Sequence, residues 1–502
     1  MTISLKTIPE EVRFVVKRLK EKGFKAYIVG GCVRDILRGI EPEDWDVATS
    51  AKPEEIQIIF PESFYSNRFF TVTVKTVSKD PKLKEIEVTT FRKETKYTDK
   101  RHPDNVEFVK TIEEDLARRD FTINAMALEI SNLKPQISKI KTQTLKLIDP
   151  FKGKEDLKNN IIRAVGNPKE RFSEDALRMM RAIRFAVVFD KDWEIEKETA
   201  EGIKKNAYGI QAISKERIRD ELLKIIMSKK AAEGIDLLRK FGLLKYIIPE
   251  LEKGYGVTQN KHHIYDCYTH ALLSLKYAAE QNFNKYVRLV ALLHDVAKPF
   301  CKRGEGLSAT FYGHEIVGAK MTSQILNRLK FSKKEIEKMV KLVRYHLFYY
   351  NVGEVKESSV RKLIRNVGME NVEDLLQVRM ADRIGSGVPK AEPYKLRHLK
   401  YIIEKVSQDP VSVKMLKVDG NDVMRILNVR SGPKVGWVLN ILLGYVLADP
   451  KKNEKEILEK EIEKLKNLSD DELSKLAIKA EKEKEKVESK KDKMTKQKYW
   501  VM

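Results

Sequence analysis

Two aspartates separated by one residue, Asp44 and Asp46, are the first side chains in the sequence that could do metal chemistry. If residues 45–49 form a strand, both carboxylates project from the same face, because side chains two apart point the same way. The alternating segment 85–90 supplies a third acid, for which we favour Glu87 near the strand centre. Carboxylate oxygens suit divalent cations, so this acidic trio predicts a site for two Mg²⁺ ions.

Two glycines, Gly30 and Gly31, stand between a predicted strand over residues 26–29 and a predicted helix beginning at Cys32. They let the backbone approach a ligand closely, and the free N–H groups of a helix start favour phosphate. Three carboxylates beside a phosphate loop suit two-metal transfer of a nucleotidyl group with release of pyrophosphate. The alternative for an isolated Asp-x-Asp is a surface turn beside an ordinary strand-to-helix corner.

A second polar set, Glu174, Asp175 and Arg178, follows Ser173, which is suited to cap a helix. We expect the helix to begin there and to continue through Arg184. Residues three and four apart are neighbours on a helix, so the three side chains would share one exposed face. The alternative is an ordinary surface ion pair.

The chemistry of nucleobases gives this second set a role. Cytosine and adenine present an amino donor beside a ring-nitrogen acceptor, so Asp175 could accept from the amine while Arg178 donates to the ring. Uracil and guanine present the reverse order and would leave buried polar groups unpaired, which predicts a roughly tenfold to several hundredfold preference. Arg181 and Arg184 add positive charge on the following turns, where we expect phosphate contacts.

Six of the eight histidines fall between His262 and His346. His294 and Asp295 stand together in an apolar segment, where a buried polar pair needs partners. The full set of candidate ligands is His270, His294, Asp295, His314, His346 and Asp382. Such nitrogen and carboxylate donors suit one or two transition-metal ions, such as Mn²⁺ or Ni²⁺. The alternative is a metal-free core in which these side chains satisfy one another.

The elements that position these residues change in type along the chain. The first 150 residues mix strand-like and helix-like patterns, whereas helical periodicity dominates after residue 157. The fold class is therefore α+β, with a mixed-sheet head followed by mostly α-helical units. We expect a head over 1–150, a neck over 151–250, a body over 251–400, a tail over 401–470 and, over 471–502, a charged segment that is helical or disordered with a frayed end.

The 502 residues carry 97 Lys and Arg against 74 Asp and Glu, a formal net charge of +23 that favours polyanionic partners. No run of eighteen apolar residues and no signal-peptide core occurs, so we expect a cytoplasmic protein without a membrane partner. Three widely spaced cysteines fit neither a disulfide framework nor a zinc cluster. The oligomeric state stays open.

Several motifs occur in a fixed order within the first 225 residues. They read Gly30-Gly-Cys-Val-Arg-Asp35, Asp44-Trp-Asp46, Glu87-Val-Thr-Thr-Phe-Arg92, Arg118-Arg-Asp-Phe-Thr-Ile-Asn-Ala-Met126 and Glu174-Asp-Ala-Leu-Arg178. Together they resemble the class II tRNA nucleotidyltransferases (CCA-adding enzymes) and bacterial poly(A) polymerases. The histidine and aspartate spacing resembles an HD-type phosphohydrolase domain. One departure is Phe70, where the pattern of the family has a glycine.

The resemblance implies a polymerase-β-like head in which Asp44 and Asp46 bind Mg²⁺ and Glu87 assists. It also implies that Glu174 orients Arg178. Four further residues would bind the nucleotide near its ribose and phosphates: Arg34, Arg118, Asp120 and Asn124.

The activity implied is template-independent addition of CMP and AMP, from CTP and ATP, to the 3′ end of tRNA, whose elbow the tail would hold. A poly(A) polymerase or an enzyme adding only the final A is the nearest alternative. An HD phosphohydrolase whose head only binds RNA is an alternative of another class. Trimming of 2′,3′-cyclic or damaged RNA ends is a candidate side activity, and the polar loop Lys93 to Asp104 is a candidate for motion between the two nucleotides.

Overall fold

The computed structural model describes residues 4–66, 70–95, 105–132, 143–260, 264–407 and 413–501. It forms two compact units, one made of Met1–Leu347 with Glu373–Pro389 and the other of Phe348–Val372 with Lys390–Met502. The finer division into head, neck, body and tail stays a prediction. Most of the hypothetical moving loop, residues 96–104, and His262 lie outside the described residues.

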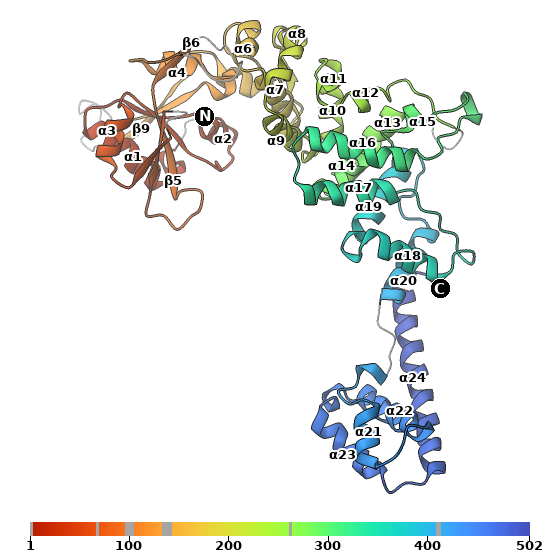
Figure 1. The fold of residues 1–502 in the computed structure, drawn as a ribbon. Coiled ribbons are helices and arrows are strands. Elements are labelled where there is room, and N and C mark those ends of the chain that lie inside the picture. The colour runs from red at the N-terminus through yellow and green to blue at the C-terminus, as the bar shows by residue number, and fades with distance from the viewer. Residues whose placement is uncertain are drawn as a thin grey trace. The chain divides into compact units, whose positions relative to one another are not determined.

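A seven-stranded mixed sheet forms the head, in the order β3-β4-β5-β2-β1-β8-β9 (Figure 1). Its strands are β1 Ala26–Val29, β2 Asp46–Thr49, β3 Ser63–Ser66, β4 Thr71–Lys75, β5 Glu85–Thr90, β8 Ala127–Asn132 and β9 Gln143–Ile148. The neighbouring strands β2 and β5 run parallel, and the other neighbours run antiparallel. The expected α+β head is therefore confirmed.

The sequence pattern explains how the sheet is buried. In β5, Ile86 and Val88 enter the core while the two glutamates point away from it, as period-two alternation predicts. Helices α1 (Glu10–Glu21) and α3 (Pro53–Ile59) pack apolar side chains on one side of the sheet. Helix α4 (Ile112–Ala117) belongs to a separate apolar cluster with residues of β1, β2 and β8. The central strands are thus fixed from both faces.

The position of the missing glycine has an unusual backbone. Phe70 adopts a positive φ of 50°, a left-handed conformation that a bulky residue rarely takes. Its ring packs edge-on against Phe108, with 5.7 Å between the ring centroids. The chain therefore keeps at Phe70 a backbone that suits glycine, and an aromatic contact accompanies it.

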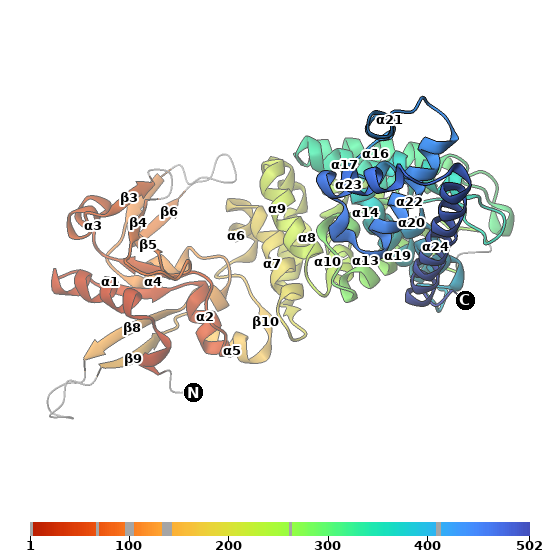
Figure 2. The same ribbon diagram turned by 90° about the horizontal axis from the view of Figure 1, so that it is seen from below.

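Helices account for most of the rest of the first unit (Figure 2). They are α5 Gly153–Asn159, α6 Pro168–Glu174, α7 Leu177–Val188, α8 Lys197–Asn206, α9 Lys215–Ile226, α10 Ala231–Lys240, α11 Leu244–Ile247, α12 Pro249–Glu252, α13 Cys267–Glu280, α14 Lys285–Leu293, α15 Lys298–Cys301, α16 His314–Arg328, α17 Lys333–Tyr345 and most of α19 Met369–Gly385. Two short strand pairs complete the unit: β6 Arg92–Thr95 runs antiparallel to β7 Asn105–Phe108, and β10 Ile161–Ile162 runs parallel to β11 Glu194–Ile195.

A buried arginine ties the neck helices to those that follow. Arg288 on α14 is only 1% exposed, yet it donates to the carbonyl oxygens of Ile226, Ser228 and Phe283 at 2.8–3.1 Å. These carbonyls lie at or just beyond the ends of elements, where intrahelical partners are missing. A single guanidinium thus satisfies several backbone acceptors of the neck and of α14 at once.

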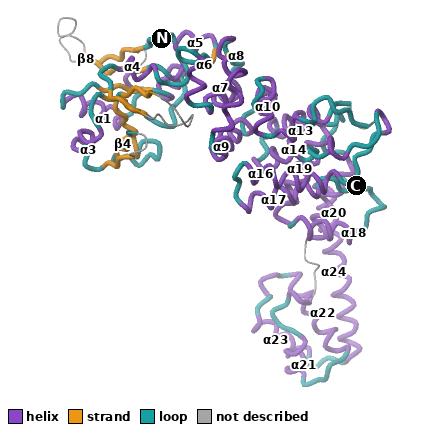
Figure 3. Tube along the Cα trace, turned by 45° about the horizontal axis from the view of Figure 1, so that its top comes forward, coloured by secondary structure: helices purple, strands orange, loops and turns teal. Residues whose placement is uncertain are grey.

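The second unit is helical (Figure 3). Its helices are α18 Glu357–Val367, α20 Tyr394–Ser407, α21 Gly420–Leu427, α22 Pro433–Ala448, α23 Lys455–Leu465 and α24 Asp470–Lys498. The apolar helix α22 has Gly432 as its N-cap residue and Pro433 as its first residue. For the segment 471–502 the helical alternative is the one found, because α24 continues to Lys498; as far as the described residues extend, no frayed end follows, and Val501 is only 4% exposed. Within the described residues, no helix combines the length and apolarity needed to cross a membrane.

Candidate functional site

The acidic edge of the head sheet is built by two parallel strands. Asp46 at the start of β2 lies directly opposite Glu87 on β5 in the strand register. Gly30, which follows β1, has a φ of 84°, and an added Cβ would lie 3.1 Å from Asp46 Oδ2. Both the backbone conformation and the space beside Asp46 therefore require glycine here.

Burial and mutual repulsion both act on the carboxylates of this edge. Burial, together with the negative charges of Asp44 and Glu87, raises the pKa of Asp46 to about 6, although Arg119 opposes the shift. Partial burial and the charge of Asp44 also raise the pKa of Glu87. Carboxylates that repel one another in this way lack positive charge, and divalent cations would supply it. The three residues therefore fit the predicted metal role chemically.

The three carboxylates are not yet gathered around one point. Among the described residues, groups of three or more ligand atoms within 4.8 Å of one another occur at the histidine and aspartate residues and not at the head edge. Asp44 is exposed, so its side chain is free to change rotamer. The edge is thus an open, repelling set of carboxylates.

The two consecutive arginines of the predicted motif do different things. Arg118 turns to Asp115, with 3.0 Å from Nε and 2.9 Å from Nη2 to the same carboxylate oxygen. Arg119 also reaches Asp115, with 3.6 Å between Nη2 and Oδ2, but its Nη1 extends to the acidic edge, where it would be 2.8 Å from a Cβ added to Gly30. Sequence reasoning singled out Arg118 and missed Arg119, because the sequence does not show which of two adjacent arginines has its side chain directed to the acidic edge.

A chain of polar contacts connects most of the other predicted nucleotide-binding residues of the head. Arg34 donates to Asn124 Oδ1 at 2.8 Å and pairs with Asp35 at 2.7 Å. Asn124 in turn donates to Asp120 at 3.1 Å, and Asp120 pairs with Arg181 of α7 at 2.6 Å. Burial alone would raise the pKa of Asp120, but the charges of Arg181 and Arg178 and the hydrogen bonds from Asn124 and Arg181 together outweigh it and lower the pKa to about 2.

The predicted helix start at Ser173 is wrong. Helix α6 ends at Glu174, and α7 begins at Leu177. Between them, Asp175 is extended, and its Oδ1 accepts the N–H of Leu177 at 3.0 Å. Both serine and aspartate favour helix starts, but the longer carboxylate also reaches Arg217 of α9 at 3.0 Å. This tertiary contact places the break two residues later.

The expected exposed face of the second polar set is also wrong, because Arg178 is only 9% exposed. The predicted pairing with Glu174 is present, at 2.7 Å between Nη1 and Oε2. Nη2 donates to the carbonyl of Arg118 at 3.1 Å, so Arg178 joins the neck to the head motif. Arg178 is therefore held by fixed acceptors.

Arg184, the last of the arginines for which we predicted phosphate contacts, is paired inside the protein. Its Nε lies 2.9 Å from Glu221 Oε2, and its guanidinium lies 4.2 Å from the ring centre of Phe185. Arg181 is likewise engaged with Asp120. Any phosphate contact by either residue would have to share or replace these partners.

All six residues of the predicted transition-metal set come together in one buried cluster. We call these residues, His270, His294, Asp295, His314, His346 and Asp382, the histidine–aspartate cluster. One subset is His270, His294, Asp295 and Asp382, and a second is Asp295, His314 and His346, each with ligand atoms within 4.8 Å of one another. Asp295 belongs to both, so its two oxygens could bridge two ions.

The histidine rings are oriented for metal binding. Nδ1 of His294, His314 and His346 lies 2.7–2.9 Å from the carbonyl oxygen three residues earlier. These contacts place the ring proton on Nδ1 and leave Nε2 facing the carboxylates, which is the arrangement typical of metal-ligating histidine. The cluster therefore fits one or two transition-metal ions.

Internal charge pairs balance the cluster. Lys298 Nζ lies 2.6 Å from Asp295, and Arg379 Nη1 lies 2.8 Å from Asp382. Burial would lower the pKa of His294, but Asp295 and Asp382 raise it to about 10. The neighbouring cations hold the pKa of Asp295 well below its usual range despite burial. Sequence reasoning missed Lys298, although its place three residues after Asp295 was a usable helical signal.

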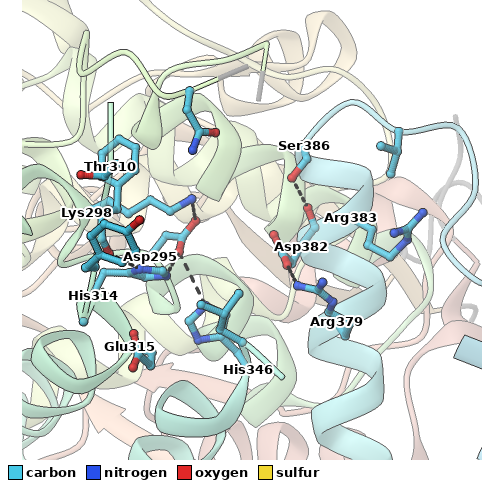
Figure 4. Close-up of a pocket in the computed structure, with 16 residues that line it drawn as sticks. Asp295, Lys298, Thr310, His314, Glu315, His346, Arg379, Asp382, Arg383 and Ser386 are labelled. Carbon is cyan, nitrogen blue, oxygen red and sulfur yellow. Dashed lines mark hydrogen bonds and ion pairs between the residues drawn. The ribbon is translucent and has the colours of Figure 1, made fainter. Parts of the chain in front are cut away.

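A cavity of about 730 Å³ opens onto the cluster (Figure 4). Figure 4 shows Asp295 with contacts to Lys298, His314 and His346, and Asp382 with contacts to Arg379 and Ser386. Arg383, also on α19, lines the same cavity. A metal-ligating floor with cationic walls suits an anionic substrate such as a phosphate ester.

A mixed sheet with an acidic edge, followed by helical units, is the arrangement of the polymerase-type nucleotidyltransferase folds, and this chain has it. Three family descriptions match the chain: "Poly A polymerase head domain" over residues 26–163, "Probable RNA and SrmB- binding site of polymerase A" over residues 192–254 and "tRNA nucleotidyltransferase domain 2 putative" over residues 309–462. Over these three segments the chain is therefore similar to tRNA nucleotidyltransferases and poly(A) polymerases.

Similar proteins agree with this assignment. CCA-adding enzymes of Ligilactobacillus salivarius and Lactococcus lactis are 43% and 42% identical over 245 and 260 residues, which cover 48% and 50% of this chain. These matches span only 56% and 59% of the two relatives' own lengths. The Bacillus stearothermophilus CCA-adding enzyme, solved with CTP, is 27% identical with a TM-score of 0.55, over 92% of this chain and 100% of that one.

Proposed function

We propose that this protein is a template-independent RNA nucleotidyltransferase that adds CMP and AMP to the 3′ end of tRNA. The observation that carries the proposal is the acidic edge beside Gly30, where Asp46 and Glu87 face each other across parallel strands. Support comes from the similarity to CCA-adding enzymes, one solved with CTP and another, from Thermotoga maritima, solved with tRNA. The latter shares the fold at 21% identity.

At the head edge, Asp44, Asp46 and Glu87 would hold two Mg²⁺ ions, which supply activation of the attacking hydroxyl and charge stabilisation of pyrophosphate when bound. The backbone at Gly30 and Gly31 gives the triphosphate close access to this edge. Before any cation binds, Arg119 provides positive charge at this edge. These residues bring the phosphates and the RNA terminus to the same place.

The neck would choose the base. Asp175 accepts from the exocyclic amine of cytosine or adenine, and Arg178 donates to the adjacent ring nitrogen. Glu174 holds Arg178 at 2.7 Å, while Arg217 holds Asp175 at 3.0 Å. Because protein side chains present the hydrogen-bonding pattern, no nucleic-acid template is needed.

The test is incorporation of labelled CTP and ATP into a tRNA transcript that lacks its CCA end. We expect both nucleotides to be added, CMP first, with Mg²⁺ required. Incorporation of ATP without CTP would replace the proposal with a poly(A) polymerase or an A-adding enzyme. A cytoplasmic location belongs to the proposal, because that is where such a substrate would be met.

A second activity, metal-dependent phosphoester hydrolysis, is favoured by one observation, the sharing of Asp295 between two ligand groups. Bound Mn²⁺ or Ni²⁺ would supply an activated water, and Lys298, Arg379 and Arg383 would hold the phosphate in the cavity. The test is hydrolysis of an RNA bearing a 2′,3′-cyclic phosphate, with His294→Ala as control. Equal rates for the two proteins would reject this activity.

A further inference from the structure

Helix α24 lies beyond residue 462, where the match to tRNA nucleotidyltransferase domain 2 ends. It is held at both of its ends within the second unit. Near its start, Ala480 packs so tightly on Gly444 of α22 that an added Cβ would come within 2.9 Å. At its end, Tyr499 donates to Glu404 of α20 at 2.7 Å. The middle of the helix carries many exposed charges.

Six exposed lysines follow one side of this helix: Lys475, Lys479, Lys482, Lys486, Lys490 and Lys493. Their spacings are three or four residues throughout, so at about 3.6 residues per turn they stay within an arc of roughly 80°. We call this row the lysine arc. It extends for about 27 Å along the axis. The buried residues Leu473, Ala477 and Ala480 lie on the opposite side.

The acidic residues of the same helix are kept off the arc. Between Lys475 and Lys493, Glu483 and Glu485 flank it, and Glu481, Glu488 and Asp492 lie further round. A solvated helix stabilised by ion pairs would mix both signs along one face. Instead, within the described part of the chain, no lysine of the arc takes part in an ion pair, whereas Asp492 is used by Lys496. The arc is therefore an uncompensated line of positive charge.

We propose that the lysine arc binds the phosphate backbone of an RNA duplex, an inference that rests on and deepens the proposed function. Lysine ammonium groups bind phosphates as point charges and read no sequence. The arc holds no aromatic side chain on which unpaired bases could stack, which favours a duplex over a single strand. The large apolar side chains that the helix exposes, Leu476, Ile478 and Met494, lie outside the arc and form no continuous face of the kind that a membrane-surface helix inserts into a bilayer.

A charge-conserving exchange tests the arc in the full chain. The variant Glu481→Lys, Lys482→Glu, Glu485→Lys, Lys486→Glu keeps composition and net charge but puts two acids into the arc. We expect the dissociation constant for a tRNA transcript to rise about tenfold or more near 0.1 M salt, because phosphate contacts are lost. The slope of log K against log salt should fall by about two to four. Helix content measured by circular dichroism should not change.

The matched control makes the same kind of exchange on the side of α24 away from the arc: Glu481→Lys, Lys484→Glu, Glu488→Lys, Lys491→Glu. We expect wild-type affinity and salt slope from it. Unchanged binding by the arc variant, or an equal loss in the control, would overturn the inference. So would retained RNA affinity with lost binding to phosphatidylserine vesicles.

The outcome is separable from that of the proposed function. A wild-type protein that binds tRNA through the arc but adds no CMP would reject nucleotidyl transfer and keep the binding surface. A protein that adds CMP with the same KM for tRNA in wild type and arc variant would reject only the arc. At saturating tRNA, we expect the arc variant to keep the wild-type rate of CMP addition.

Discussion

At the acidic edge of the head, Asp46 faces Glu87 across two strands and has Arg119 as its opposing charge, whereas Asp295 in the histidine–aspartate cluster is surrounded by histidines and Lys298. The pKa of Asp46 is raised, and the pKa of Asp295 is lowered. Two candidate metal sites in one chain thus reach opposite electrostatic states before any ion binds.

The opposite pKa shifts of Asp46 and Asp295 follow from the positions of the two sets of carboxylates in the fold. Helices fix the cluster residues in a core, where a buried charge must be paired, so cations from the protein itself balance each carboxylate. The head edge is open, and its ligands come from strand ends that a nucleotide and its cations can reach. We infer that the negative charge of the edge is balanced by the cations that arrive with the nucleotide, while the cluster is pre-organised.

The largest expected effect is at the edge. Asp46→Asn should lower CTP addition by about 10³-fold or more, because one carboxylate fewer remains to hold the cations and the developing charge. The same change removes a repelling charge, so we expect the melting temperature of the metal-free protein to stay the same or rise. Radiolabelled CTP addition and calorimetry in a chelator check the two halves. A variant with wild-type activity would remove the edge from the reaction.

The same substitution in the cluster should have the opposite effect on stability. Asp295→Asn leaves buried cations without their anion, which typically costs about 3–5 kcal/mol, so the melting temperature of the metal-free protein should fall. Affinity for Mn²⁺ should drop by about a hundredfold or more, since both ligand groups lose a member. Metal titration followed by calorimetry measures this, and CTP addition serves as the control. Equal stability changes at Asp46 and Asp295 would break the comparison.

A smaller effect is expected where neither metal site is touched. Arg178→Ala and Asp175→Ala should each reduce the preference for CTP and ATP over UTP and GTP by roughly tenfold to several hundredfold, because the pattern offered to the base is lost. Competition between labelled nucleotides on one tRNA transcript measures the preference. Mg²⁺ binding should be retained, which separates base choice from the head edge. Unchanged selectivity in both variants would refute the template role.

Local patterns predicted the parts of both sites that lie within one element. Alternation in 85–90 placed the glutamates on the side away from the core, and the strand, glycine pair and helix over 26–38 were found where expected. Local patterns do not predict which strands pair with one another. Glu87 was chosen as the partner of Asp46 because the metal chemistry needs a third acid, whereas the strand patterns themselves do not predict that β2 and β5 are neighbours, since register between distant segments depends on the whole sheet.

The errors in the neck have the same origin. Ser173 is a good local cap, but Asp175 is also held by Arg217, forty-two residues away, and that contact sets the helix break. Arg178 was expected to be exposed because its own helix gives no sign that the carbonyl of Arg118 will cover it. The histidines and aspartates scattered over 270–382 were grouped correctly, because buried polar side chains must find polar partners and this part of the sequence contains few other candidates.

Asp120 extends the comparison, because it is a paired carboxylate within the head. Its pKa of about 2 lies below the ordinary value of 3.8, so the folded state gains stability that is complete above about pH 4 and disappears as the pH falls toward 2. A shift of this size corresponds to about 2 kcal/mol. In Asp120→Asn, the urea midpoint of the transition that includes the head should therefore be lower than in wild type at pH 7, and the difference should narrow to about a third of that value near pH 2.5. A constant difference across this range would mean that the ion pair with Arg181 does not stabilise the contact between head and neck. A difference that narrows would show that this contact depends on a carboxylate balanced by a cation of the protein, as Asp295 is, and unlike the carboxylates of the acidic edge.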